Sequence, residues 1–416
     1  APHLNPLPRG EEKEIFDCNF PFSASRTLWK TFLFSTVSVG CGPVLPAIAT
    51  LAFVLLLTGL ILIHEVGHFL VARLSGVKVE EFGFGLPPRI FTLFQWRGTH
   101  FTLNWIPVGG FVRLKGEGAM TESARMAKGS FARAGILRRS AILLAGVGMN
   151  FLLAFLIFLV GFSVGGWIPT YRTILELNAA RERGDIQFTP SVVIEDVVAG
   201  LGADSAGVLR QSVLLKVDAV PVYSPDDVVR EQSGKRQVRY TLLIGPSHEQ
   251  ESTVRVSVQD GKTGVLLRSV PRDLIAKHRS ITASSVLALR ESWVVMVQTV
   301  RGMGALFLSV LRSASVPKEV TGIIGIAHLT YASVQEGIGT YLRLVALLSL
   351  SLAALNVLPF PALDGGRLLF VLLECLWRKP PSRRIELTIN MVGFSVLIGL
   401  IVLVTFYDIL RLFVVS

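Results

Sequence analysis

The chain has 416 residues, of which 51% are hydrophobic and 17% charged, and its mean hydropathy is +0.55. Soluble globular proteins contain about 25% charged residues, so this composition argues against an ordinary soluble enzyme and against a disordered or collagen-like chain. The net charge of +11 does not indicate nucleic-acid binding, because much of the basic charge flanks long apolar runs. Three widely spaced cysteines form neither a disulfide framework nor a zinc ribbon.

The first 43 residues form an N-terminal extension of undefined role. Arg26 and Lys30 precede an apolar run that ends in small residues before Cys41, and this faintly resembles a signal or lipoprotein sequence. An extension with no targeting role is at least an equal alternative.

Four uncharged runs are long enough to cross a bilayer, which takes about 20 helical residues. These runs are 44–63, 141–171, 344–363 and 387–407. A fifth apolar stretch, 293–311, is interrupted by Arg301 and flanked by charges, and we expect an interfacial or re-entrant helix there. The sequence therefore predicts four membrane spans.

Basic residues in the short loops give the orientation of these spans. Eleven Lys and Arg residues lie between spans one and two, and the loop between spans three and four contains Arg378, Lys379, Arg383 and Arg384. We expect both loops in the cytoplasm, which leaves the segment 172–290 and both chain ends on the outer side.

The first span ends in a pattern typical of a metal site. His64 and His68 are four residues apart, so both rings lie on one face of a helix and can reach one ion. Glu65 lies next to the first histidine, which completes the HExxH arrangement of zinc metalloproteases. Ionisable residues at the end of an apolar helix are costly and usually serve function, although three interfacial polar residues are the plain structural alternative.

A catalytic zinc needs a third protein ligand, and the best candidate follows the third predicted span. Two prolines and two glycines between residues 359 and 366 must break the helix there. Asp364 lies in this break, on the same cytoplasmic side as the two histidines, and Asn356 lies two helical turns earlier. A proline-kinked helix end with an interfacial aspartate is the simpler alternative.

At these residues the sequence resembles the site-2 protease family of intramembrane zinc metalloproteases, and in particular its bacterial regulator of sigma-E protease branch. The resemblance runs from about residue 50 to 413. Its motifs are His64-Glu-Val-Gly-His68, Phe82-Gly-Phe-Gly85, Ile106-Pro-Val-Gly-Gly-Phe-Val-Arg113, Leu144-Ala-Gly-Val-Gly-Met-Asn150, Gly322-Ile-Ile-Gly-Ile-Ala327 and Asn356 with Leu363-Asp-Gly365.

The resemblance implies a role for each site residue. His64, His68 and Asp364 would bind one Zn2+ per chain, and Glu65 would be the general base. Asn356 would bind the substrate backbone. The alternating residues 97–115 contain Gly109 and Gly110 and are expected to form a membrane-associated β-hairpin that holds substrate.

The outer segment resembles one PDZ domain, with strands expected at 192–198, 238–244 and 253–258. Two departures put its loops in doubt. Gln211-Ser212 replaces the usual Gly-Asp turn, and Asp218-Ala219 replaces the usual Asn-Gly turn.

The expected fold is thus an α-helical polytopic membrane protein with four transmembrane helices, a membrane-associated β-hairpin and one inserted α+β PDZ-like domain. Its expected parts are the extension 1–43, the first part of the protease core 44–171, the PDZ-like domain 172–272, a linker with an interfacial helix 273–340 and the second part of the core 341–416. The resemblance implies a multi-pass protein of the inner membrane, with its active site near the cytoplasmic side and the PDZ-like domain outside.

The expected partners are the lipid bilayer and single-span membrane proteins already trimmed outside the membrane, such as an anti-sigma factor, and no nucleic acid. A membrane scaffold without catalytic activity is one alternative, although a scaffold does not need Glu65. A metal transporter is another, but transporters carry inverted repeats with broken helices in both halves, and only one span here is broken by Pro and Gly. The sequence gives no oligomeric state.

Overall fold

The computed structural model describes residues 44–414 except 118–120, 172–173, 245–249, 260, 278, 314–315, 318–319 and 379–381. The described residues form two compact units, one made of 44–167 with 279–414 and the other of 168–277. The predicted extension 1–43 lies outside the described residues.

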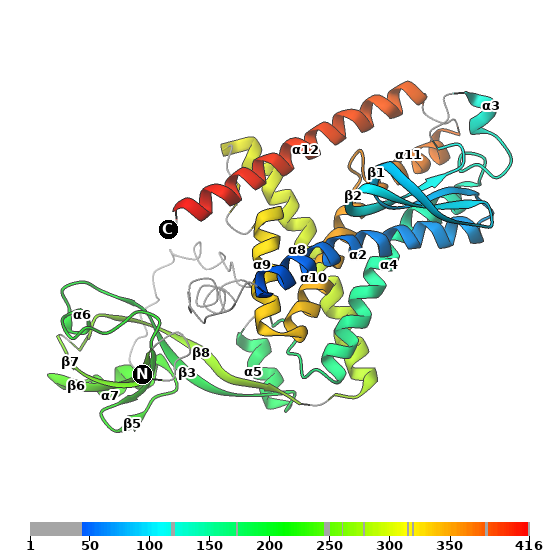
Figure 1. Ribbon diagram of the computed structural model, residues 1–416. Coiled ribbons are helices and arrows are strands. Elements are labelled where there is room, and N and C mark those ends of the chain that lie inside the picture. Colours follow the sequence, from blue (N-terminus) through cyan, green and yellow to red (C-terminus); the bar gives the residue numbers. More distant parts are fainter. Residues whose placement is uncertain are drawn as a thin grey trace, which may run out of the picture. The chain divides into compact units, whose positions relative to one another are not determined.

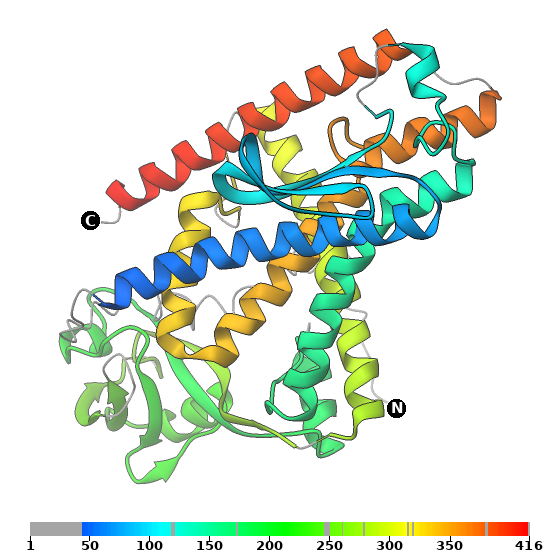
Figure 2. The same cartoon turned by 45° about the vertical axis from the view of Figure 1, so that its right-hand side comes forward.

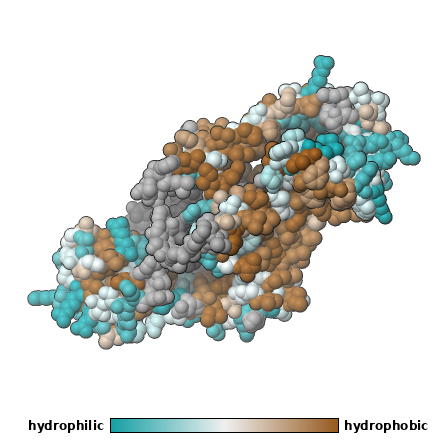
Figure 3. All heavy atoms as spheres, in the orientation of Figure 1, coloured by the Kyte–Doolittle hydropathy of each residue, from teal (hydrophilic) through white to brown (hydrophobic). Residues whose placement is uncertain are grey.

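The larger unit is built mainly of helices (Figure 1). Its helices are α2 (Val44–Leu74), α3 (Glu122–Arg125), α4 (Ile136–Ser163), α8 (Ile281–Ser313), α9 (Ile323–Glu336), α10 (Ile338–Val357), α11 (Asp364–Trp377) and α12 (Arg383–Val414). Apolar side chains cover much of their visible surface (Figure 3), as expected for helices that face lipid.

Five of these helices are long and apolar enough to cross a membrane. Four of them, α2, α4, α10 and α12, correspond to the predicted spans, although α4 ends at Ser163 and α10 at Val357, before the predicted ends at 171 and 363. The fifth is α8, which covers the stretch 293–311 that the sequence predicts as interfacial or re-entrant. Length and composition thus allow one more crossing than the four predicted, and the multi-pass character is confirmed.

Helices α8 and α10 run in the same direction. Thr299 of α8 lies 3.4 Å from Ser351 of α10, and further along α8 the ring of Phe307 packs against Phe360, just beyond the end of α10. The chain between the two helices therefore returns to the end at which α8 begins. If α8 crosses the membrane, the chain therefore still returns before α10 begins. The expectation that the end of α10 lies on the same side as the histidines of α2 is unaffected.

Strands β1 (Val79–Trp96) and β2 (Thr99–Leu114) form the sheet of this unit, which lies along α2 (Figure 2). The predicted hairpin 97–115 corresponds to β2 alone, and its partner strand lies before it. Phe82 of β1 pairs with both Phe101 and Val112 of β2. The two halves of β2 therefore pair with opposite edges of the first part of β1, and β2 bends between them. The hydroxyl of Thr58, midway along α2, donates to Pro107 O, which places this bend beside the apolar part of the helix.

The smaller unit contains a sheet of six strands. They are β3 (Ile186–Val197), β4 (Val213–Val217), β5 (Val220–Pro221), β6 (Gln237–Ile244), β7 (Gln250–Ser257) and β8 (Val265–Ala276), in the order β7-β6-β4-β3-β8 with β5 paired to β4. Three short helices accompany them: α5 (Ile174–Glu182), α6 (Gly202–Ser205) and α7 (Pro225–Gln232). The three predicted strands are present as β3, β6 and β7.

Two turns of this unit keep a left-handed backbone without glycine. Gln211 has φ 64° and Asp218 has φ 57°. Such a conformation costs an L residue roughly 1–2 kcal/mol. At Asp218 the carboxylate offsets part of this cost, because it accepts hydrogen bonds from the Arg239 backbone N–H and from Lys235 Nζ. The substitutions that put the loop geometry in doubt therefore still form turns here, and the PDZ assignment stays a prediction.

Candidate metal centre

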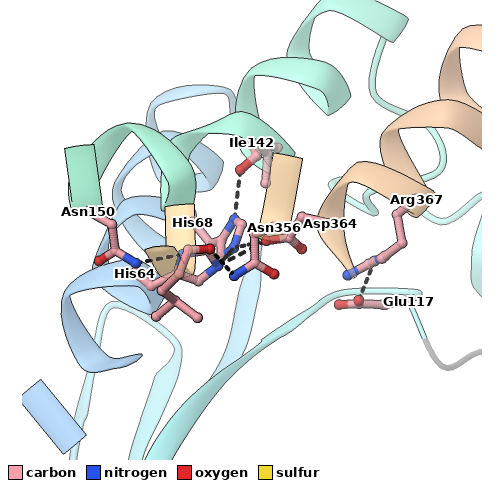
Figure 4. A network of polar contacts seen from close by, with 9 residues as sticks. His64, His68, Glu117, Ile142, Asn150, Asn356, Asp364 and Arg367 are labelled. Atoms are coloured by element: carbon pink, nitrogen blue, oxygen red, sulfur yellow. Dashed lines mark hydrogen bonds and ion pairs between the residues drawn. The ribbon is translucent and has the colours of Figure 1, made fainter. Parts of the chain in front are cut away.

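Three side chains predicted as metal ligands meet in the larger unit (Figure 4). The Nε2 atoms of His64 and His68 lie 3.1 Å apart on one face of α2. Asp364 Oδ2 lies 2.9 Å from the first of these nitrogens and 3.1 Å from the second. Both histidines are buried, and the aspartate side chain is only 15% exposed.

The helix break predicted before Asp364 is present. Helix α10 ends at Val357, and α11 begins at Asp364 itself. A side chain at Gly366 would clash with the backbone of Phe360 and Pro361, so the loop can fold tightly over this helix start only with glycine there. The loop is also held from α12, because Asn390 Oδ1 accepts a hydrogen bond from Ala362 N–H at 3.2 Å.

Helix α4 packs against the two histidines and hydrogen-bonds one of them. His68 Nδ1–H donates to the carbonyl oxygen of Ile142 at 2.7 Å. The α4 backbone comes this close because residue 146 is glycine: a Cβ there would lie 2.6 Å from Nε2 of both histidines. Gly67 has the same role on α2, where a Cβ would clash with the Ala145 backbone.

These atoms suit a small divalent cation. Since Nδ1 of His68 carries the proton donated to Ile142, its Nε2 offers a lone pair to the centre. That lone pair converges with Nε2 of His64 and with a carboxylate oxygen, and such a group needs a positive charge to hold it together. Two imidazole nitrogens and one carboxylate oxygen form a donor set used by catalytic zinc, with a further position left for water.

A cavity of about 280 Å³ opens beside the three ligands. Glu65 and Asn356 both line it, together with Phe111 and Val112 of β2. Glu65 also hydrogen-bonds the backbone of Val112. The amide of Asn356 donates to Leu352 O within its own helix at 3.0 Å. The structure therefore brings five of the seven predicted site residues together.

Gly109 and Gly110 do not line this cavity. A Cβ at Gly110 would lie 2.7 Å from Leu62 of α2, and one at Gly109 would touch Ile61. Close packing of β2 against α2 explains Gly110, and a left-handed backbone with φ 88° explains Gly109. Their predicted contact with substrate stays a prediction.

Sequence reasoning missed an ion pair that also lines the cavity. Glu117, just after β2, pairs with Arg367 of α11, one helical turn beyond Asp364 (Figure 4). A second missed pair joins α4 to α11 through two hydrogen bonds of 2.8 and 2.7 Å from Arg139 to Glu374. No motif reveals either pair, because their partners are 250 and 235 residues apart.

Comparisons with known proteins agree with this geometry. The profile of peptidase family M50 matches residues 52–400. Three similar proteins carry the name "putative zinc metalloprotease". The protein from Clostridium perfringens is 28% identical over 87% of this chain and 97% of its own length, and the one from Campylobacter jejuni is 27% identical over 88% and 94%. The third, from Rhizobium meliloti, is 28% identical over 87% and 96%.

Proposed function

The chain belongs to peptidase family M50, and on that premise we propose that it cleaves the transmembrane segments of single-span membrane proteins. It is a multi-pass membrane protein and a zinc metalloprotease. The proposal goes further in three respects: the cut lies within the membrane, one Zn2+ is held by His64, His68 and Asp364, and Glu65 is the general base.

The observation that carries the proposal is the position of the two histidines within an apolar helix. His64 and His68 lie in a helix long and apolar enough to span a membrane, and the cavity beside them is lined by that same helix. Ionisable groups in such a helix are expensive and mark functional pathways. A protease that acts only on soluble loops does not need its centre there.

Zinc bound at this site supplies Lewis acidity, which activates water and polarises a carbonyl. Glu65 lines the same cavity, so its carboxylate is placed to accept a proton from water and later to donate it to the leaving amine. Asn356 lines the same cavity, and its amide can exchange the hydrogen bond to Leu352 for one to the substrate backbone.

A transmembrane helix must unwind before it can be cut, and unpaired backbone is costly in lipid. Phe111 and Val112 place one stretch of β2 at the cavity wall. An unwound peptide that adds there as a further strand would regain backbone hydrogen bonds. Substrates should therefore carry helix-weakening residues near the cut.

We place the protein in the inner membrane, with its active site near the cytoplasmic side and residues 172–272 outside as a PDZ-like domain. There this domain would exclude substrates that have not been trimmed, and a trimmed anti-sigma factor fits the substrate class.

The test is cleavage in reconstituted vesicles of a single-span substrate with a Gly-Pro pair in its apolar segment, compared with a version carrying Leu-Ala. We expect cleavage of the first substrate within the membrane segment, mapped by mass spectrometry, and at least about tenfold slower cleavage of the second. Equal rates, or cuts only outside the segment, would overturn the proposal.

A further inference from the structure

A buried amide beside His64 has an unused hydrogen-bonding atom. Asn150 of α4 is fully buried, and its Nδ2 lies 3.4 Å from Nδ1 of His64. The other end of the amide, Oδ1, has no hydrogen-bond partner. A buried acceptor without a partner costs about 1–3 kcal/mol, so this arrangement calls for an explanation.

The chemistry of the metal ligand decides which end of the amide belongs next to the ring. His64 presents Nε2 to the centre, and a metal takes the lone pair of that nitrogen. A neutral imidazole with a bare Nε2 carries its proton on Nδ1, so Nδ1 must donate a hydrogen bond. An amide NH2 facing this N–H could not form a hydrogen bond with it, because both groups are donors. A half-turn of the amide exchanges its two ends, which have nearly the same shape.

We propose that the carbonyl oxygen of Asn150 accepts the Nδ1–H of His64 and thereby makes Asn150 a positioning residue of the zinc site. It fixes the tautomer and the ring orientation that expose Nε2, and the inference rests on the proposed function, since it assumes that zinc binds there. The Ile142 carbonyl has the same role for His68, so α4 orients both rings.

One further contact holds Asn150 in place for this role. Its backbone oxygen accepts a hydrogen bond from Ser349 Oγ of α10 at 2.8 Å. Both residues are fully buried. The contact joins the segment of α4 beside the histidines to α10, the helix that contains Asn356. The Leu144–Asn150 motif, which the catalytic roles leave unexplained, therefore supplies Gly146 for close approach and Asn150 for the hydrogen bond.

The experiment measures the zinc affinity of purified full-length protein in detergent by competition with a chelator. Asn150→Leu keeps the size of the side chain but removes the acceptor, and the affinity should fall 10- to 100-fold, as for other partners of metal-binding histidines. Asn150→Asp offers only acceptor oxygens and should stay within about threefold of the wild type. Gly148→Ala is the matched control on α4, because a Cβ there meets nothing within 4 Å.

Each result has one meaning. Equal affinity of the wild type and Asn150→Leu overturns the proposal, and so does an Asn150→Asp as weak as Asn150→Leu, since the amide would then act as a donor. A wild type that binds no stoichiometric zinc defeats the proposed function instead. Thermal unfolding of the zinc-free proteins identifies a variant that does not fold, and Asn150→Ala then replaces Asn150→Leu.

Discussion

The close approach of α4 to the histidines gives a sharp prediction for Gly146→Ala. The added Cβ would lie 2.6 Å from Nε2 of both His64 and His68, where ordinary contact begins at 3.4 Å. Either the rings or the helix backbone must therefore move by about 0.8 Å. Zinc–ligand distances tolerate deviations of only about 0.2 Å, so the displaced nitrogens can no longer share one ion. We expect zinc affinity to fall at least about 100-fold, which is about 2.7 kcal/mol.

The assay is chelator competition, with zinc-free thermal unfolding measured in parallel. Gly148→Ala adds the same methyl group two residues away, where it meets no atom within 4 Å. Since alanine favours a helix by about 1 kcal/mol over glycine, this control should unfold at an equal or higher temperature and bind zinc normally. A Gly146→Ala protein that binds zinc as tightly as the control would refute the packing argument.

Two further predictions concern the contacts that hold the helices. The hydrogen bonds from Arg139 hold the pKa of Glu374 below its ordinary value. This pair therefore stabilises the fold fully at pH values above the ordinary glutamate pKa of about 4.3. The stabilisation is lost as the pH falls through the lowered pKa. The melting temperature of the wild type should therefore exceed that of Glu374→Gln between about pH 6 and 8 and approach it in acid; a difference that does not change with pH would contradict this. Asp408 Oδ2 accepts the backbone N–H groups of Gly322 and Gly325, so Asp408→Ala should destabilise the protein by about 1.5–3 kcal/mol, with Asp408→Asn between it and the wild type. Denaturant unfolding checks this, and an Asp408→Ala as stable as the wild type would exclude a stabilising role for the contact.

The sequence predicted most of the geometry of the candidate site because its signals are local. Helical spacing places His64 and His68 on one face, and the prolines and glycines around Asp364 break the helix where the structure begins α11. The break after α10 also explained how Asp364 could serve as a third ligand on the same side as the two histidines. These arguments need only a few neighbouring residues and the period of a helix.

The remaining parts depend on contacts between distant segments, which a single sequence does not reveal. The hairpin was predicted only as 97–115, because the prolines at 87 and 88 obscure the alternation of β1. The return of the chain after α8 rests on the packing of Thr299 against Ser351. The role of Asn150 required its distance to His64, 86 residues away. Gly109 and Gly110 were predicted to bind substrate, which stays a prediction; the structure adds a close contact with α2 at Gly110 and a left-handed backbone at Gly109.

The most direct measurement compares the wild type with Glu65→Gln on a trimmed single-span substrate in the same vesicles. Zinc content is determined for both proteins, since the substitution leaves His64, His68 and Asp364 in place. We predict one zinc per chain in each protein and cleavage within the membrane segment by the wild type alone. Equal cleavage by both proteins, or none by a folded and zinc-loaded wild type across several trimmed substrates, would contradict the assignment of an intramembrane protease with Glu65 as its base.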